Sequence, residues 1–107
     1  MSIPKHYPFI NVKAVKAKIW RHKKPKEIHI TARTTARTLL ALSLAGTQGV
    51  TALEISSWAF RLGAYVYTLK HQYGLDIQTI REAHPHGWHG RYILHTPVEV
   101  MDIEFDK

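Results

Sequence analysis

The sequence predicts an α+β fold in which three short helices are followed by a β-hairpin. Apolar residues recur at helical spacing in segments 34–45 and 61–73, and a glycine directly follows each segment. Between them, Thr51 and Glu54 have the Thr-x-x-Glu spacing of a capping box, which marks the start of a further helix. After the last helical segment the pattern changes to the alternation that is typical of β-strands. The expected order is therefore helix, helix, helix, strand, loop and strand.

The first helix is expected over residues 34–45. Its periodic positions are Ala36, Leu39, Leu40 and Ser43. Thr34 or Thr35 can cap its start, because a threonine hydroxyl can accept a hydrogen bond from a free backbone N–H. Gly46 follows the last periodic residue and is expected to stop the helix.

The second and third helices are expected to be separate. The second starts at Thr51, whose side-chain oxygen accepts a hydrogen bond from the N–H of Glu54 in a capping box. The third runs from about 61 to 73 and carries an apolar stripe formed by Leu62, Val66, Leu69 and Tyr73. The apolar residues of the two segments are out of phase, which predicts a turn near residues 58–60. Gly74 is expected to end the third helix.

The hairpin is expected from two alternating segments, LDIQTIREA beginning at Leu75 and RYILHTP beginning at Arg91. The linker between them, HPHGWHG at residues 84–90, contains one proline and two glycines. We interpret it as a long, mobile tip rather than a two-residue turn.

The 107 residues are enough for one folded domain with flanking segments. The domain is expected over residues 31–97, between a basic N-terminal arm (residues 1–30) and an acidic C-terminal tail (residues 98–107). The net charge is +7, and the first 26 positions hold no acidic residue. The arm is expected to include a strand or short helix around residues 11–20, with a short alternation at 27–30. The tail could add a strand through its alternating Val98, Val100, Ile103 and Phe105.

The composition argues against several classes of function. No cysteine is present, which excludes disulfides, thiolate metal sites and a cysteine nucleophile. No apolar run reaches the roughly 18 residues of a membrane span, and no signal peptide is evident, so a cytoplasmic protein is expected. None of the serines lies in a nucleophile elbow, and no phosphate-binding glycine loop occurs. We therefore expect a non-enzymatic protein with no cofactor and no small-molecule substrate.

The stretch AHPHGWHGRYIL places three histidines within six positions and raises the question of a metal site. His84, His86 and His89, with His95 from across the hairpin, could supply imidazole ligands to zinc. However, Pro85 is poorly suited to a strand ladder, and neither a cysteine nor a diagnostically spaced acid supports the site. We expect no bound metal. A tip that touches a partner and an exposed loop without a partner both stay open.

Three helices followed by a hairpin is the element order of a winged helix. The run TALEISSWAFRLGAYVYTLKHQYGLDIQTIRE, with the glycine-rich tip and RYIL after it, resembles the winged-helix (helix-turn-helix) DNA-binding domains of phage, prophage and small bacterial proteins over residues 36–96. The matching positions are Thr51 and Glu54, Arg61 and Leu62, Leu69 and Lys70, Gly74, Thr79, and Arg91, Tyr92 and Leu94. Tyr65 departs from the family, in which a basic residue is more usual.

The resemblance implies that the third helix enters the major groove while the hairpin wing and the arm lie on the DNA backbone. The helix would present Arg61, Ala64, Tyr65, Tyr67, Thr68 and His71. The wing would add His86, Trp88, His89 and Arg91, and backbone contacts would come from Lys23, Lys24, Lys26, Arg33 and Arg37. For Arg61, contact with a guanine and contact with a phosphate both stay open, and Tyr65 could instead seal the core.

The sequence thus predicts a small, sequence-specific or semi-specific binder of double-stranded DNA, either a transcriptional regulator or a phage-type accessory factor. Because one such module reads few base pairs, a homodimer is expected. Two alternatives stay open. The chain could be a winged-helix module for protein–protein interaction without direct DNA binding, and its basic arm could be solvated without a dedicated partner.

Overall fold

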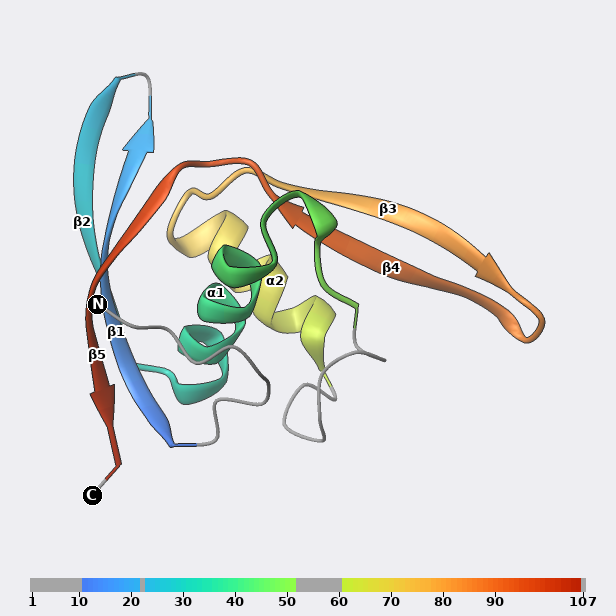
Figure 1. Ribbon diagram of the computed structural model, residues 1–107, viewed down its shortest axis with the longest axis horizontal. Helices are drawn as coiled ribbons and strands as arrows, with labels where there is room; N and C mark the ends of the chain where they lie inside the picture. Colours follow the sequence, from blue (N-terminus) through green and yellow to red (C-terminus); the bar gives the residue numbers. More distant parts are fainter. Residues whose placement is uncertain (1–10, 22, 52–60, 107) are drawn as a thin grey trace.

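A mixed α and β architecture is described by a computed structural model of the chain over residues 11–21, 23–51 and 61–106. Its elements are β1 (Val12–Arg21), β2 (Lys24–Ile30), α1 (Arg33–Ala45), the 3-10 turn η1 (Gly46–Gln48), α2 (Leu62–Gln72), β3 (Ile77–His84), β4 (Gly87–Leu94) and β5 (Val98–Phe105). One antiparallel sheet has the strand order β2-β1-β5, and β3 and β4 form a separate hairpin. The three-stranded sheet lies at one end of the molecule, the helices in the middle, and the hairpin projects from the other end (Figure 1).

The prediction of a three-helix core followed by a hairpin is wrong for the described residues, which contain two α-helices and more strand than helix. The basic arm supplies β1 and β2, and the acidic tail supplies β5. The sequence did not distinguish a strand from a helix at β1, because the pairing of β1 with β5 shifts register twice. Ala14 and Val15 are therefore both buried, and strict alternation is lost. The expected second helix and most of its capping box fall on residues 52–60, outside the described residues. Of the strand or short helix expected around residues 11–20, the structure has a strand, and the strand that the tail could add is also present.

Opposite charges meet where β1 pairs with β5. Lys16 lies across from Asp102, and Lys18 lies across from Glu99. Side chains of cross-strand partners project to the same face of a sheet, and opposite charges there are mutually stabilising. The separation of basic and acidic residues along the sequence therefore becomes charge compensation across the outer face of the sheet.

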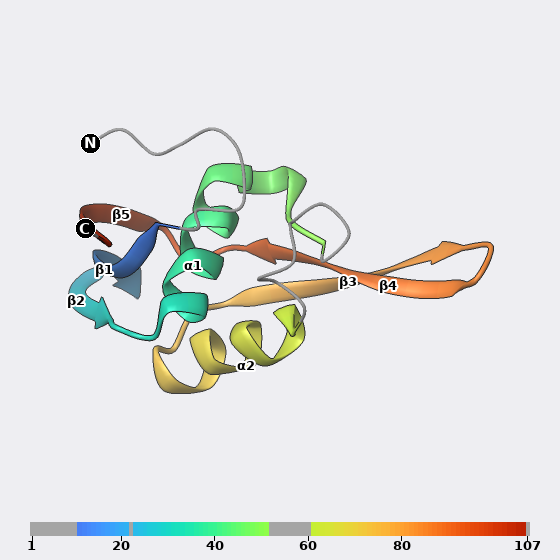
Figure 2. The same ribbon diagram turned by 90° about the horizontal axis from the view of Figure 1, so that it is seen from below.

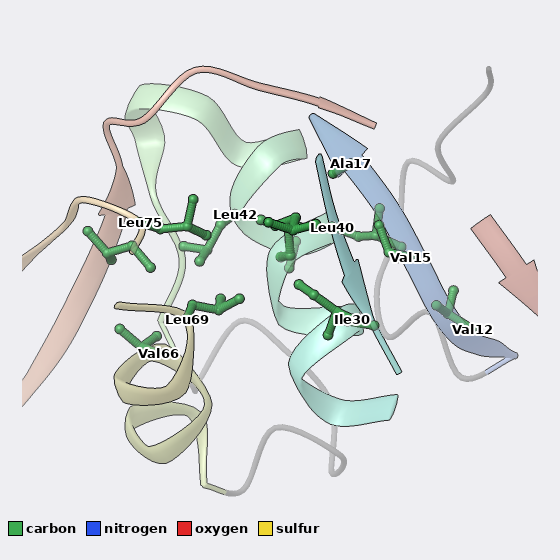
Figure 3. Close-up of a cluster of buried hydrophobic side chains, with 14 of the residues drawn as sticks. Val12, Val15, Ala17, Ile30, Leu40, Leu42, Val66, Leu69 and Leu75 are labelled. Carbon is green, nitrogen blue, oxygen red and sulfur yellow. The ribbon is translucent and has the colours of Figure 1, made fainter. Parts of the chain in front are cut away.

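Helix α1 lies between the three-stranded sheet and α2. Its buried positions surround the helix and are Thr35, Ala36, Thr38, Leu39, Leu40, Ala41 and Leu42. Leu40 lies on the side of β1 and β2, and Leu42 lies on the side of α2 (Figure 3). A helix that is apolar almost all round is stable only when it is covered on several sides. The sheet built from the arm and the tail provides the cover that α2 alone cannot.

The sequence predicted the C-terminal end of α1 correctly but not its N-terminal cap. The predicted cap at Thr34 or Thr35 is wrong, because the N-cap is Ala32 and no side chain caps the helix. The backbone oxygen of Thr34 instead accepts a hydrogen bond from the buried Thr38 hydroxyl at 2.8 Å. Gly46 stops the helix as predicted, with φ at 57° and its N–H donating to the Leu42 oxygen.

Helix α2 has the orientation that its apolar stripe predicts, because Leu62, Val66 and Leu69 are all buried. Its C-terminus is closed by a hydrogen bond in which the N–H of Leu75 donates to the oxygen of Leu69 at 3.1 Å. Gly74, with φ at 74°, allows the chain to turn here and ends the helix as predicted. The outward face of α2 is thereby fixed.

The hairpin is longer and its tip tighter than the sequence suggested. The pairing of β3 with β4 continues as far as His84 across from Gly87, so only residues 85 and 86 form the turn. The predicted long, mobile tip is therefore wrong. The proline occupies the turn and interrupts no ladder bond, which lets the strands extend well beyond the helices (Figure 2).

Gly49 anchors the hairpin to the rest of the molecule. It precedes Val50, whose backbone exchanges two hydrogen bonds of 2.9 Å with Tyr92 of β4. A Cβ atom at Gly49 would lie 2.7 Å from the backbone oxygen of Tyr92. Gly49 also has φ at 71°. Gly46 has a similar φ, but a Cβ atom there would meet nothing within 4 Å.

We predict that Gly49→Ala destabilises the fold more than Gly46→Ala. Both variants place alanine in a backbone region that is nearly exclusive to glycine, at a cost of about 1–3 kcal/mol. Only Gly49→Ala adds the overpacking of the β4 backbone, a further cost of about 1–3 kcal/mol. Urea unfolding followed by circular dichroism measures both variants. Equal losses of stability in the two variants would contradict this close approach.

Candidate nucleic-acid interface

Helix α2 presents an open outward face. Arg61, Ala64, Tyr67 and His71 are exposed along it, and 63% of Tyr67 is accessible to solvent. The rings of Tyr67 and His71 lie against each other with their centroids 4.0 Å apart and their planes tilted by 31°, which gives this part of the helix an exposed aromatic surface. The small Ala64 beside them leaves space for a close approach to the helix backbone.

Two further predicted residues of α2 are less available. Thr68 is half-buried and donates its hydroxyl hydrogen to the backbone oxygen of Ala64 at 3.2 Å, which leaves only the acceptor function of the hydroxyl for a partner. Tyr65 is also half-buried, at the flank of the outward face. The centre of a contact surface on α2 is therefore Tyr67 and His71.

One face of the β3–β4 hairpin is directed to the α2 side. Tyr92 is on this face, and a Cβ atom at Gly63 in the first turn of α2 would lie 3.3 Å from its hydroxyl oxygen. Because side chains alternate between faces, the cross-strand pairing places Arg81 and Trp88 on the same face as Tyr92, further toward the tip. The Arg81 guanidinium carbon lies 4.2 Å from the centroid of the Trp88 ring, and 55% of Trp88 is exposed. The Arg81 cation and the exposed Trp88 ring thus lie on the hairpin face that is directed to the α2 side.

Sequence reasoning missed Arg81 although it identified Trp88. Residues 84–90 were interpreted as a loop, so no strand register was assigned that would have placed Arg81 near Trp88. A hairpin with a two-residue turn at 85 and 86 pairs Ala83 with Trp88, and this pairing places Arg81 on the same face. His86 is exposed in that turn. The side chain of His84 is outside the described residues.

The opposite face of the hairpin carries a network centred on Glu82. Its carboxylate accepts a hydrogen bond from Arg91 Nε at 2.9 Å, and its other oxygen lies 2.9 Å from His89 Nε2. Arg91 also donates through Nη1 to the backbone oxygen of Gln48 in η1 at 3.1 Å. Figure 2 shows η1 and α2 on opposite sides of the hairpin. His89 and Arg91, predicted to contact DNA, therefore lie on the hairpin face away from α2, where Arg91 connects the hairpin to η1 and His89 contacts Glu82 across the strands.

The hydrogen bond from Arg91, and to a lesser degree the one from His89, lowers the pKa of Glu82 below its ordinary value of 4.5. The ionised carboxylate is the form that both partners stabilise. The network therefore fixes the hairpin against η1 while Glu82 is charged.

The two predicted arginines of the first helix also make internal contacts. Arg33 forms an ion pair with Asp106, and this hydrogen-bonded pair lowers the pKa of Asp106. Arg37 donates through Nε to the backbone oxygen of Val12 at 3.0 Å. Both contacts join the start of α1 to the sheet. The structure therefore places these two arginines at the junction of helix and sheet, away from the hairpin formed by β3 and β4.

The lysines at the tip of the β1–β2 hairpin differ from those in the body of the sheet. Lys23, Lys24 and Lys26 are exposed, and the pairing with β5 ends at Ile19 opposite Val98, so no acidic strand continues beside the tip. The cross-strand partners of Lys24 and Lys26 are Arg21 and Ile19. The positive charge of these lysines has no acidic residue across from it, in contrast to that of Lys16 and Lys18 in the body of the sheet. We call this surface (Lys23, Lys24 and Lys26) the basic tip.

Neither a metal centre nor a membrane-spanning helix is found in the described part of the chain. In residues 11–21, 23–51 and 61–106, no three histidine or acidic side chains lie close enough together to hold a metal ion. None of the helices described there combines the length and apolar character needed to cross a bilayer.

Comparison with known proteins relates the chain to one family. A family model described as a winged helix domain matches residues 27–104, which span β2 to β5 and include α2 and the β3–β4 hairpin. Comparison with curated proteins gives no match, and comparison with solved structures gives none.

We predict that Glu82→Gln weakens the pH dependence of stability. A carboxyl group whose pKa is lowered by folding stabilises the fold above its unfolded pKa, and this contribution disappears as the pH falls through the lowered folded value. Wild type should therefore lose melting temperature below about pH 4.5 more steeply than Glu82→Gln, which already melts lower at pH 7.

The measurement is thermal unfolding by circular dichroism at several values between about pH 7 and pH 3. Glu27→Gln is the matched control, because the side chain of Glu27 is exposed on β2 and makes no hydrogen bond or ion pair with another described residue. A Glu82→Gln profile that parallels wild type, with the same melting temperature at pH 7, would contradict the role of the network.

Proposed function

We propose, on the premise that this chain belongs to the winged helix domain family, that it is a small protein that binds double-stranded DNA. In this proposal it acts in the cytoplasm as a transcriptional regulator or as a phage-type accessory factor. The observation that carries the proposal is that the open face of α2 and the Arg81–Trp88 face of the hairpin are on the same side of the molecule.

Helix α2 is the element that enters the major groove in this proposal. A major groove about 12 Å wide accepts one α-helix, and the small Ala64 lets the helix backbone approach the base edges. Tyr67 and His71 are the exposed side chains at the centre of the helix face. Arg61 at the helix start contacts either a guanine or a phosphate. Thr68, whose hydroxyl hydrogen is already used, can only accept a hydrogen bond from a base.

The hairpin formed by β3 and β4 is the wing, and it contacts DNA through the side that faces α2. Arg81 provides the cation, and Trp88 provides an aromatic surface that packs against the sugar-phosphate backbone. Glu82 has the opposite role on the other face, where its contacts with His89 and Arg91 hold the wing at a fixed angle. His86, in the turn, extends the contact toward the next phosphate.

The basic tip supplies the remaining phosphate contacts. Its three exposed lysines, Lys23, Lys24 and Lys26, have no acidic strand beside them. The lysines within the sheet are less suitable, because Lys16 and Lys18 lie across from Asp102 and Glu99. Binding through several phosphates releases condensed counterions and therefore weakens steeply as salt is added.

A homodimer is part of this proposal. A single helix in one groove reads few base pairs, and two copies on successive half-sites provide the specificity that a regulator needs. The acidic β5 is an unfavourable edge for pairing with its own copy, because Glu99, Asp102 and Glu104 of two copies would approach one another. The two copies are therefore expected to meet elsewhere.

We predict that alanine variants of the DNA side weaken binding while a variant of the outer sheet face does not. Anisotropy of a labelled duplex is measured at about 50 and 200 mM salt. Arg81→Ala and Arg61→Ala should each weaken binding about 5-fold to 100-fold, as expected for the removal of about 1–3 kcal/mol of binding free energy. The triple variant Lys23→Ala, Lys24→Ala, Lys26→Ala should also flatten the salt dependence, by about one unit of slope for each phosphate that is no longer neutralised.

Lys16→Ala is the control, because Lys16 is exposed but faces Asp102 across the strands. Sedimentation of the complex should give two chains per duplex, and a single chain would contradict the homodimer. Absence of binding at low salt, or equal affinities for Arg61→Ala, Arg81→Ala and wild type, would overturn the DNA proposal. Such a result would favour a protein-interaction module.

A further inference from the structure

An open cleft of about 530 Å³ lies where the β1–β2 hairpin, the end of α2 and the connection from β4 to β5 meet. Its lining includes Trp20, Lys70, Asp76, His95 and Thr96. The volume is within the range of about 300–1,000 Å³ that is usual for small-molecule sites. The cleft is separate from the outward face of α2, although Lys70 is on the flank of that helix.

The backbone around the cleft is held by hydrogen bonds from three directions. The Trp20 N–H donates to the Pro97 oxygen at 3.1 Å, and the His95 N–H donates to the Asp76 oxygen at 2.8 Å. The Asp76 N–H donates to the Thr96 hydroxyl at 2.7 Å. The side chains that line the cleft are therefore presented from a fixed frame, which lowers the entropic cost of binding a ligand.

Two unlike charges face this cleft. Lys70 and Asp76 are both exposed, and neither side chain makes a hydrogen bond or an ion pair with another described residue. Trp20 contributes an indole ring that is 40% exposed. The cleft therefore offers a cation, an anion and an aromatic surface together.

We propose that this cleft binds a free α-amino acid with an aromatic side chain. The carboxylate of the ligand pairs with Lys70, its ammonium group pairs with Asp76, and its ring packs on Trp20. A simple anion such as a phosphate is disfavoured by Asp76, and a simple cation is disfavoured by Lys70. A zwitterion satisfies both charges at once, and charge-assisted hydrogen bonds of this kind are stronger than neutral ones.

The cleft joins three parts of the molecule that the proposed function assigns to DNA binding. Trp20 continues into the basic tip, Lys70 belongs to α2, and His95 lies at the base of the wing. A ligand in contact with all three favours one relative arrangement of these parts. If the proposed function holds, the amino acid changes the affinity for DNA, and DNA changes the affinity for the amino acid by the same factor. Binding of the amino acid itself does not depend on that function.

The test uses three matched probes with the full chain in the absence of DNA. L-phenylalanine carries both charges, 3-phenylpropionate lacks the ammonium group, and 2-phenylethylamine lacks the carboxylate. Isothermal titration calorimetry should give an affinity for L-phenylalanine that is at least about tenfold above that of either single-charge probe. This factor corresponds to one charge-assisted hydrogen bond that the single-charge probe cannot make.

Two variants assign the charges. Asp76→Asn should weaken L-phenylalanine about tenfold without weakening 3-phenylpropionate, whose carboxylate Asp76 repels. Lys70→Met should weaken L-phenylalanine about tenfold without weakening 2-phenylethylamine, whose ammonium group Lys70 repels. Lys16→Met, on the outer sheet face, is the control and should bind like wild type. Circular dichroism confirms that the exposed substitutions leave the fold intact.

The proposal is overturned if none of the three probes gives a heat of binding in calorimetry or changes the amide chemical shifts of the protein in an NMR titration. Equal affinity for the three probes also overturns it. Because no DNA is present, neither result bears on the DNA proposal. Conversely, absence of DNA binding by the wild type, or equal DNA affinities of the wild type and Arg61→Ala, would overturn the DNA proposal and leave the amino-acid titration unaffected.

Discussion

The antiparallel pairing of β1 with β5 is the interaction on which the rest of the structure depends. It joins segments that are 79 to 93 residues apart in the chain, from Ile19 across from Val98 to Val12 across from Phe105. This pairing completes the sheet that covers one side of α1, while α2 covers another. Without this pairing, apolar residues around α1 would be exposed to water. The resulting loss of folding free energy would be large compared with the small net stability of a domain of this size.

The same pairing distributes the charge of the molecule. Acidic residues of β5 lie across from lysines of β1, so much of the +7 net charge is not presented by the body of the sheet. Among the described residues, exposed cations without an acidic neighbour across the strands include the lysines of the basic tip and Arg81 on the α2 side of the wing. Although the first 26 residues are strongly basic, the strand pairing limits the uncompensated positive charge to part of the surface. The fold also fixes the position of that part relative to α2.

The elements that depend on interactions between residues close in the sequence were predicted correctly. The α2 stripe and the glycines that follow α1 and α2 were identified correctly, because helical period and left-handed backbone are visible over a few residues. The partnership of β1 and β5 was missed, since strand pairing across most of the chain leaves no local signal and two register shifts disturbed the alternation. Within the site, the outward residues of α2 followed from phase alone. The faces of the wing did not, because they depend on a two-residue turn at Pro85 and His86 that was interpreted as a long loop.

The central proposal is that α2, the Arg81–Trp88 face of the wing and the basic tip contact DNA while the outer face of the sheet does not. Chemical-shift mapping of isotope-labelled protein titrated with a short duplex at low salt tests this claim most directly. The account predicts that amide signals of Tyr67, Arg81 and Lys24 shift and that the indole signal of Trp88 shifts with them. Shifts concentrated at Lys16, His29 and Asp102, with α2 unaffected, would contradict it.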